Sequence, residues 1–171
     1  DLLDLLEENL SPDCQWDISF PINRLTGIDE IMQELILPLR KAFPNIQRRD
    51  EIFIGGHNRR DNGGDWVSSI THYVGNFTEP LLGIPPSNGL VFLRSGEFYR
   101  IKDGRISEAK LIIDFLDLLL QIDRFPLPKM LGTEMLFPGP ATHDGVLPDN
   151  RNQGEATLDL AEAMLSDLKV F

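Results

Sequence analysis

One cysteine, Cys14, stands in a chain of 171 residues, so an intrachain disulfide framework and a cysteine-based metal site are both excluded. No apolar run in the sequence approaches the roughly 20 residues that a membrane-spanning helix requires, and no segment has the pattern of a secretory signal peptide. Basic side chains are scarce too, with 16 Lys and Arg against 27 Asp and Glu and a formal net charge of −11. Because nucleic-acid binding needs clustered Lys and Arg, we expect no nucleic-acid partner. We also expect no membrane partner and a cytoplasmic location.

Motifs of metal and cofactor sites are missing as well. The histidines His57, His72 and His143 do not stand at metal-ligand spacing, which argues against a metal site. No glycine-rich phosphate loop follows a strand-like run, and no serine occupies a nucleophile elbow. The small basic groups Arg48-Arg49 and Arg59-Arg60 are interpreted as solvated strand ends.

What the chain does have is a hydrophobic content of 42%, which suits one globular domain with a substantial core. Leu2–Leu10 and Ile28–Leu39 have the apolar spacing of helices, and Cys14–Phe20 alternates as a half-buried strand does. Several strand-like runs then follow one another between Glu51 and Asp114, and helical spacing returns in residues 114–122. This order predicts an α+β domain with helices gathered on one face of an antiparallel sheet.

After residue 124 the composition changes. Residues 125–154 are rich in proline and glycine and are interpreted as a tail or linker. Apolar residues at helical spacing then predict a C-terminal amphipathic helix within residues 155–171. The chain is therefore divided into a pocket domain of residues 1–124, the tail and this helix.

The strongest local signal is Asp103-Gly104, which stands between two strand-like runs. An Asp-Gly pair in this setting predicts a two-residue hairpin turn, because both central residues of a type I′ turn need positive φ. Such a turn also sets the register, which places Lys102 opposite Arg105 and Tyr99 opposite Glu108. With regular alternation, one face then holds Glu97, Tyr99, Ile101, Ile106, Glu108, Lys110, Ile112 and Asp114.

That face mixes charges with isoleucines and a tyrosine, as the wall of a small-molecule pocket does. We predict a pocket that holds Tyr99, Glu108, Lys110 and Asp114 together, with Glu97 nearer its rim. The competing interpretation is an edge hairpin in which Glu97 and Lys110 form only a surface ion pair.

The opposite face of the hairpin is predicted to be apolar, and its members are Phe92, Phe98, Ala109, Leu111 and Ile113. An apolar face of this size needs a cover. We therefore expect the protein to form a homodimer.

Four blocks in this order and spacing resemble the SnoaL-like polyketide cyclases, a family of the nuclear-transport-factor-2-like superfamily. The blocks are residues 38–44 (PLRKAFP), 82–89 (LGIPPSNG), 97–106 (EFYRIKDGRI) and 112–114 (IID), and the likeness covers about residues 13–122. The resemblance implies a cone-shaped fold, in which a strongly curved, mostly antiparallel sheet and its helices close a central pocket. It also suggests that the C-terminal helix is the first helix of a second copy of the domain; the alternative is a terminal helix that packs on its own domain.

The resemblance implies an enzyme without metal or cofactor that closes a ring in a small carbonyl compound by aldol condensation, or a related isomerase or dehydratase. An aspartate on the last strand serves as acid and base in the family, and Asp114 holds that position here. Lys110 or Tyr99 would stabilise the enolate oxygen. Asp114 also stands where a strand gives way to a helix, so the alternative role is that of a helix N-cap.

Two departures from the family pattern bear on the substrate. Tyr73 stands where the family commonly has a histidine, and His72 comes one residue earlier, so in a regular strand only one of the two faces the pocket. Lys110 stands where the family often has tryptophan, while Glu108 matches its glutamate. The expected pocket wall is completed by Ile112, Trp66 and Trp16.

Two other functions compete with the enzyme. This scaffold hosts many activities, so the domain could bind a small molecule without catalysis, or serve as a dimerising accessory domain. Burial of Asp114 in a cavity beside Lys110 and Tyr99 would favour the enzyme.

Overall fold

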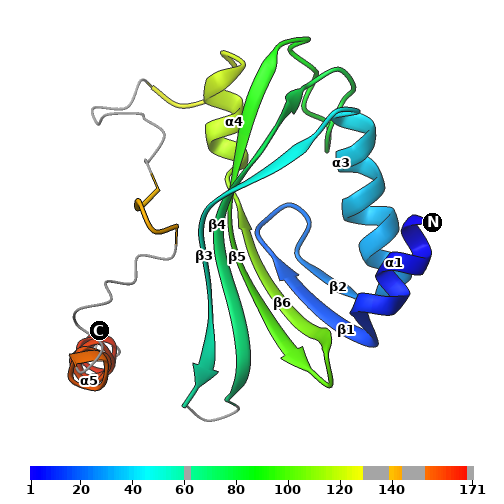
Figure 1. The fold of residues 1–171 in the computed structure, drawn as a ribbon. Coiled ribbons are helices and arrows are strands. Elements are labelled where there is room, and N and C mark those ends of the chain that lie inside the picture. Colours follow the sequence, from blue (N-terminus) through cyan, green and yellow to red (C-terminus); the bar gives the residue numbers. More distant parts are fainter. Residues whose placement is uncertain (60–62, 129–138, 144–152, 169–171) are drawn as a thin grey trace.

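A computed structural model describes residues 1–59, 63–128, 139–143 and 153–168 of the chain. Figure 1 shows one strongly curved, unclosed sheet with helices on its inner side. The strand order is β2-β1-β6-β5-β4-β3. The strands are β1 (Leu10–Ile18), β2 (Arg24–Thr26), β3 (Gln47–Asn58), β4 (Gly64–Asn76), β5 (Leu90–Lys102) and β6 (Arg105–Ile113). The predicted α+β class and the curved sheet are confirmed.

The helices are α1 (Leu2–Asn9), α2 (Gly27–Ile31), the π-helical turn η1 (Met32–Ile36), α3 (Leu37–Ala42), α4 (Phe115–Gln121) and α5 (Gly154–Asp167). α2, η1 and α3 follow one another without a break, which confirms the amphipathic helix expected there. The π-helical turn ends at Ile36, two residues before Pro38, which is the second residue of α3. Since proline has no N–H to donate, a change of hydrogen-bonding pattern at this point is compatible with it.

Most strand pairs are antiparallel, but β1 pairs with β6 in parallel. This pairing brings the start of the chain beside the last strand of the hairpin. Trp16 of β1 lies opposite Ala109 of β6, and Ile18 lies opposite Leu111. The parallel pair therefore adds β1 to the sheet beside β6 and extends the inner face of the sheet.

The inner face of the sheet packs against the helices and forms the core. Its apolar side chains include Leu93, Leu111 and Ile113, which share one buried cluster with Ile31 and Phe43 of the helical side. Burial of such side chains contributes about 1.5–3 kcal/mol each relative to exposure. This cluster holds the helices against the sheet.

The β5–β6 hairpin confirms the predicted turn and corrects the predicted register. Asp103 and Gly104 have φ of +52° and +76°, and Lys102 pairs with Arg105 as expected. A bulge then follows, so that Arg100, and not Tyr99, lies opposite Glu108. One extra residue turns every later side chain of β6 to the other face. The predicted face that joined Glu97 and Tyr99 to Glu108, Lys110 and Ile112 is therefore wrong.

The predicted apolar outer face is corrected by the same bulge. Ala109, Leu111 and Ile113 point inward and are at most 5% exposed. Phe98 does lie on the outer face, as predicted, and its exposed apolar neighbours there are Ile112 and Ile70.

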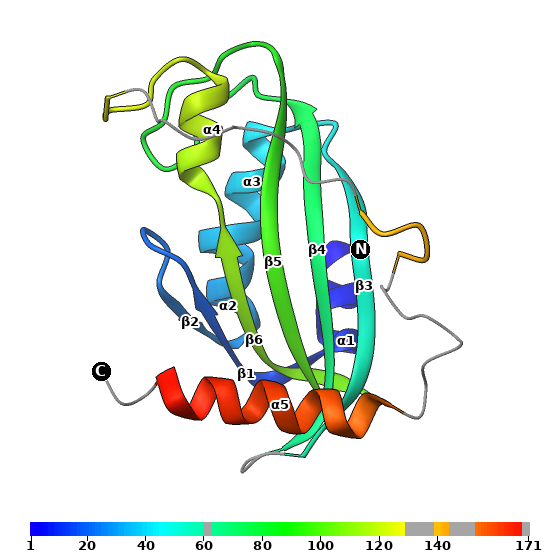
Figure 2. The same cartoon turned by 90° about the vertical axis from the view of Figure 1, so that its left-hand side faces the viewer.

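The C-terminal helix exists as predicted, and α5 lies on the side of the sheet opposite to α1–α3 (Figures 1 and 2). Arg59, just after β3, forms ion pairs with Glu155, Asp159 and Glu162 of α5 at 2.9, 2.6 and 3.3 Å. No residue of α5 is buried. Most of the tail of residues 125–154 lies outside the described residues.

Candidate active site inside the curved sheet

A buried polar group lies on the inner face of the sheet, at the middle of β5. Its centre is Glu97, whose side chain is 0% exposed. Among the described residues it is the one buried carboxylate. We call it, together with Arg48, Ser69, Tyr73 and Tyr99, the Glu97 cluster.

Hydrogen-bond donors surround the Glu97 carboxylate. Tyr73 donates its hydroxyl to Oε1 at 2.8 Å, and Tyr99 donates to Oε2 at 2.6 Å. Arg48 donates Nη1 to the same Oε2 at 2.7 Å, and the Ser69 hydroxyl lies at 3.4 Å from it. Charged hydrogen bonds of this kind are about twice as strong as neutral ones, so they offset part of the cost of burying the charge.

Strand register explains why these side chains meet. Glu97 pairs with Ser69 on β4 and with Leu111 on β6, so all of them face inward. Tyr99 lies two residues from Glu97 on β5, and Tyr73 lies four residues from Ser69 on β4, so both share this face. Arg48 pairs with Tyr73 from the edge strand β3 and reaches along the sheet to Glu97.

Arg48 connects the cluster to the outside. Its side chain is 33% exposed, while Glu97 is enclosed. The guanidinium also binds Asp50 through Nε at 2.9 Å and the Ser69 hydroxyl through Nη2 at 2.8 Å. Arg48 therefore links the enclosed Glu97 to the surface, and Tyr73 and Tyr99 are also partly exposed residues.

Both phenols of the cluster are held in the protonated form. Burial, followed by the negative charge of Glu97, raises the pKa of Tyr73 above its ordinary value of 10.0. The same causes raise the pKa of Tyr99 above 10.0. At neutral pH each hydroxyl therefore has a proton to donate to Glu97.

Trp16 lies beside the cluster. Its ring meets Tyr99 edge to face, with centroids 5.9 Å apart. Trp16 is 7% exposed, and its indole nitrogen is buried without a hydrogen-bond partner.

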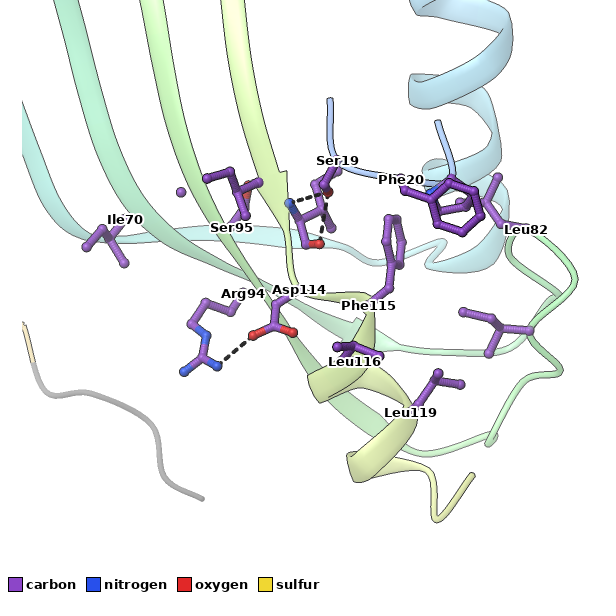
Figure 3. A pocket seen from close by; sticks show the side chains of 15 residues that line it. Ser19, Phe20, Ile70, Leu82, Arg94, Ser95, Asp114, Phe115, Leu116 and Leu119 are labelled. Atoms are coloured by element: carbon purple, nitrogen blue, oxygen red, sulfur yellow. Dashed lines mark hydrogen bonds and ion pairs between the residues drawn. The ribbon is translucent and has the colours of Figure 1, made fainter. Parts of the chain in front are cut away.

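Asp114 lies elsewhere, at the end of β6 and the start of α4, as Figure 3 shows. Its Oδ1 accepts the backbone N–H of Asp117 at 3.0 Å, so it is the N-cap of α4. Its Oδ2 forms an ion pair with Arg94 at 2.7 Å. Both oxygens are thus already engaged.

Asp114 also borders an open cavity of about 1020 Å³. The lining is mostly apolar and includes Phe20, Ile112, Leu116 and Leu119, with Arg94 and Asp114 as its charged pair. Tyr99, Lys110 and Glu108 are not part of this lining. The structure therefore does not bring together the four residues that the register argument placed in one pocket.

Lys110 and Glu108 belong to a network of ion pairs on the outer face. Lys110 lies 3.0 Å from Glu108 and 3.5 Å from Asp17, and Glu108 lies 3.7 Å from Arg100. These pairs are partly exposed, and such pairs contribute little to stability.

The choice between His72 and Tyr73 is settled by the strand pairing. Tyr73 faces the inside and joins the cluster, whereas His72 faces the outer side, where its Nδ1 lies 3.4 Å from Glu51 Oε1. Trp66 shares the outer face with His72, because the two residues stand an even number of positions apart on β4 and side chains alternate between the faces. Neither lies at the Glu97 cluster.

Arg48 and Ser69 are not among the site residues predicted from the sequence, and Glu97, predicted nearer the rim, is buried. Arg48 was interpreted as a solvated strand end because it stands beside Arg49 and Asp50, and that interpretation is wrong. The available signal was the alternation of Arg48 and Asp50 with Arg49, which places Arg48 on one face if β3 extends back to Gln47.

The inward positions of β6 are taken by Ala109, Leu111 and Ile113, none of which titrates. The last strand thus presents no acid inside the sheet, and the adjacent strand supplies Glu97 instead.

No group of His, Cys, Asp and Glu within the described part of the chain could hold a metal ion. Nor does any helix found there have the length and apolarity needed to cross a membrane.

Solved structures with the same fold are numerous. A proposed SnoaL-like polyketide cyclase from Jannaschia sp. CCS1 is 21% identical, with a TM-score of 0.57 over 74% of this chain and 80% of that one. AclR from Streptomyces galilaeus, a proposed hydroxylase, is 21% identical, with a TM-score of 0.58 over 75% and 79%. IdmH from Streptomyces antibioticus, a proposed polyketide cyclase, is 20% identical, with a TM-score of 0.57 over 71% and 86%.

At this identity the structural matches show the fold. No curated protein matches the chain. The SnoaL-like polyketide cyclase family, in contrast, matches over residues 2–122, which includes every strand, the Glu97 cluster and Asp114. The chain therefore belongs to the SnoaL-like polyketide cyclase family.

Proposed function

We propose that this protein closes a ring in a small carbonyl compound by intramolecular aldol chemistry, with the Glu97 cluster as its acid/base centre. The observation that carries the proposal is the contact between the Tyr99 hydroxyl and Glu97 Oε2 at 2.6 Å. It joins Tyr99, a partly exposed residue, to an enclosed carboxylate on the inner face of the sheet, in a chain of the SnoaL-like polyketide cyclase family.

In the first step a proton leaves the carbon between two carbonyl groups of the substrate. It passes to the Tyr99 oxygen while the Tyr99 proton passes to Glu97, so the carboxylate takes up one proton and the substrate becomes an enolate. The charge of Arg48 stabilises the enolate oxygen. Positioned proton transfer of this kind contributes about 10²–10⁴-fold to a rate.

In the second step the enolate carbon attacks a carbonyl carbon farther along the same molecule. A carbon–carbon bond forms, and the carbonyl oxygen becomes an alkoxide. The two protons then move back along the same path, from Glu97 to Tyr99 and from Tyr99 to the alkoxide. The site returns to its starting state and the product is a ring with a hydroxyl group.

Asp114 is the competing base. Its Oδ1 already accepts the Asp117 N–H and its Oδ2 is paired with Arg94, so neither oxygen can take a substrate proton without giving up a contact. Its cavity nevertheless has the mostly apolar lining of a small-molecule site. This cavity supports a second candidate function, the binding of a small molecule without catalysis.

Turnover of a designed substrate separates these possibilities. A suitable compound is a β-keto ester that bears a ketone far enough along its chain to close a six-membered ring. Tyr99→Phe removes the relay hydroxyl and Glu97→Gln removes the proton acceptor, and each should lower kcat by about 10²–10⁴-fold. Asp114→Asn is the matched control, since it changes the other carboxylate and preserves the cap, and it should leave kcat within about twofold.

The opposite pattern would contradict the proposal. If Asp114→Asn abolishes turnover and Tyr99→Phe retains it, Asp114 is the base. If wild-type protein binds a panel of such esters but turns over none, the non-catalytic function is favoured.

A further inference from the structure

The buried indole nitrogen of Trp16 needs an explanation. An N–H group enclosed without a partner costs about 1–3 kcal/mol, and native proteins seldom leave one unsatisfied. Four buried side-chain atoms lack a partner among the described residues: Trp16 Nε1, Trp66 Nε1, His72 Nε2 and Ser95 Oγ. Of the two indoles among them, only Trp16 belongs to the inner face.

The place of Trp16 links it to the Glu97 cluster. Trp16, Ala109 and Tyr99 form one row across β1, β6 and β5. The side chain of Ala109, in the middle of the row, is a single methyl group. The rings of Trp16 and Tyr99 on either side of it have their centroids 5.9 Å apart. A compound that approaches Tyr99 therefore approaches Trp16 too.

We propose that Trp16 is a specificity-determining residue whose indole N–H donates to an oxygen of the bound compound. This rests on the proposed function, because it assumes that a carbonyl compound binds at Tyr99. An indole nitrogen donates and cannot accept. The compound must therefore place an acceptor, such as a ketone or ester oxygen, at this point, and a hydrocarbon or ammonium group there is disfavoured.

Nuclear magnetic resonance of the indole groups can test this directly, because the chain has two tryptophans. Nitrogen-15-labelled protein should give two indole signals, and Trp66→Phe identifies that of Trp16. The probe is ethyl benzoylacetate, a β-keto ester with an aromatic ring, and its matched control is pentylbenzene, which has no oxygen. We expect the β-keto ester to move the Trp16 N–H proton signal downfield, as a new hydrogen bond does, and pentylbenzene to leave it in place.

Affinity provides a second measurement. Trp16→Phe retains an aromatic ring and loses the donor, so it should weaken ethyl benzoylacetate binding about 3–10-fold, the value of one hydrogen bond. It should leave the affinity for pentylbenzene nearly unchanged. A purely structural role for Trp16 would instead weaken both compounds alike.

The outcomes separate this inference from the proposed function. If the β-keto ester shifts backbone signals near Tyr99 but not the Trp16 indole, the inference on Trp16 is overturned and the proposed function is not. If the Trp16 proton already resonates downfield and exchanges with a buried water in the free protein, the inference also fails. If neither ethyl benzoylacetate nor the designed ring-closing esters bind, both fail together.

Discussion

Charge balance at single residues holds the inside of this sheet together. Glu97 is fully enclosed, and its charge is balanced by Arg48, whose side chain is 33% exposed. Removing one partner of a buried pair is costly because the other charge loses its compensation. The cluster should therefore contribute to stability as well as to chemistry.

Arg48→Ala should lower the free energy of unfolding by about 2–4 kcal/mol, because it leaves Glu97 buried without its cation. The neighbouring Arg49→Ala is the matched control, since Arg49 is exposed and on the other face of β3, and it should change the value by less than about 0.5 kcal/mol. Urea denaturation of both variants gives the comparison. Equal stabilities would show that Arg48 is only a solvated strand end.

The raised pKa values of the two tyrosines predict a loss of stability at alkaline pH. Above their ordinary pKa of 10.0 the phenols ionise in the unfolded chain, while the folded protein retains their protons. The unfolded state then binds fewer protons, so stability is complete below pH 10 and falls as pH rises above it. Urea denaturation from about pH 9 to about pH 11 should show this fall, and Tyr73→Phe should reduce it. A flat profile in wild-type protein would count against the cluster.

At the scale of elements, short sequence patterns predicted the features that depend only on neighbouring residues. The Asp103-Gly104 turn has the positive φ values that its residue types favour, and the helices follow their apolar spacing. Missed features depend on distant partners. The bulge between Arg100 and Ile101 has no signature in the residues themselves. Nor has the parallel β1–β6 pair, since the pairing of Trp16 with Ala109 joins chain segments far apart.

The one-residue bulge in the β5–β6 pair explains why the predicted site is not formed. It separated Glu108, Lys110 and Ile112 from Glu97 and Tyr99, although every one of them was named from the sequence. Trp16 lies beside Tyr99. The pairing of β4 with β5 places Tyr73 on the inner face, a choice between Tyr73 and His72 that the sequence left open. The alternation of Arg48 with Arg49 predicts the inward position of Arg48 only if β3 extends back to Gln47, and its contact with the buried Glu97 depends on a distant strand.

The junction of β6 and α4 provides a test of the cap. Asp114→Ala should lower the free energy of unfolding by about 1 kcal/mol or more, because Asp117 N–H and Arg94 both lose an acceptor. Asp114→Asn keeps an acceptor for the helix end and should cost only a few tenths of a kcal/mol beyond the loss of the partly buried ion pair with Arg94. Thermal denaturation distinguishes the two. Identical melting temperatures for both variants and wild type would contradict the cap.

At the scale of the whole molecule, the outer face of the sheet still needs a cover. Phe98 is 44% exposed and Ile112 66%, and exposed apolar side chains gathered on one face mark interaction surfaces. The homodimer therefore stays a prediction, now carried by these residues in place of Ala109, Leu111 and Ile113. The interpretation of α5 as the first helix of a second copy also stays a prediction.

Light scattering can check the dimer. Wild-type protein should have the mass of two chains, with an interface of about 1,600 Å² in total, and Phe98→Lys should shift it to one chain. Leu160→Lys on α5 is the control, since Leu160 is 72% exposed and outside the sheet, and it should leave the mass unchanged. A single-chain mass for wild type at high concentration would contradict the prediction.

The central claim, that an enclosed carboxylate holds two protonated phenols inside the sheet, can be measured without a substrate. Tyr73 and Tyr99 are the two tyrosines of the chain, so its phenolate absorbance reports on the cluster alone. In a near-ultraviolet titration the folded protein should show no phenolate at pH values just above 10, where the urea-unfolded chain ionises, and Glu97→Gln should move the folded curve toward lower pH. Ionisation of both tyrosines near pH 10 in the folded wild-type protein would contradict the account.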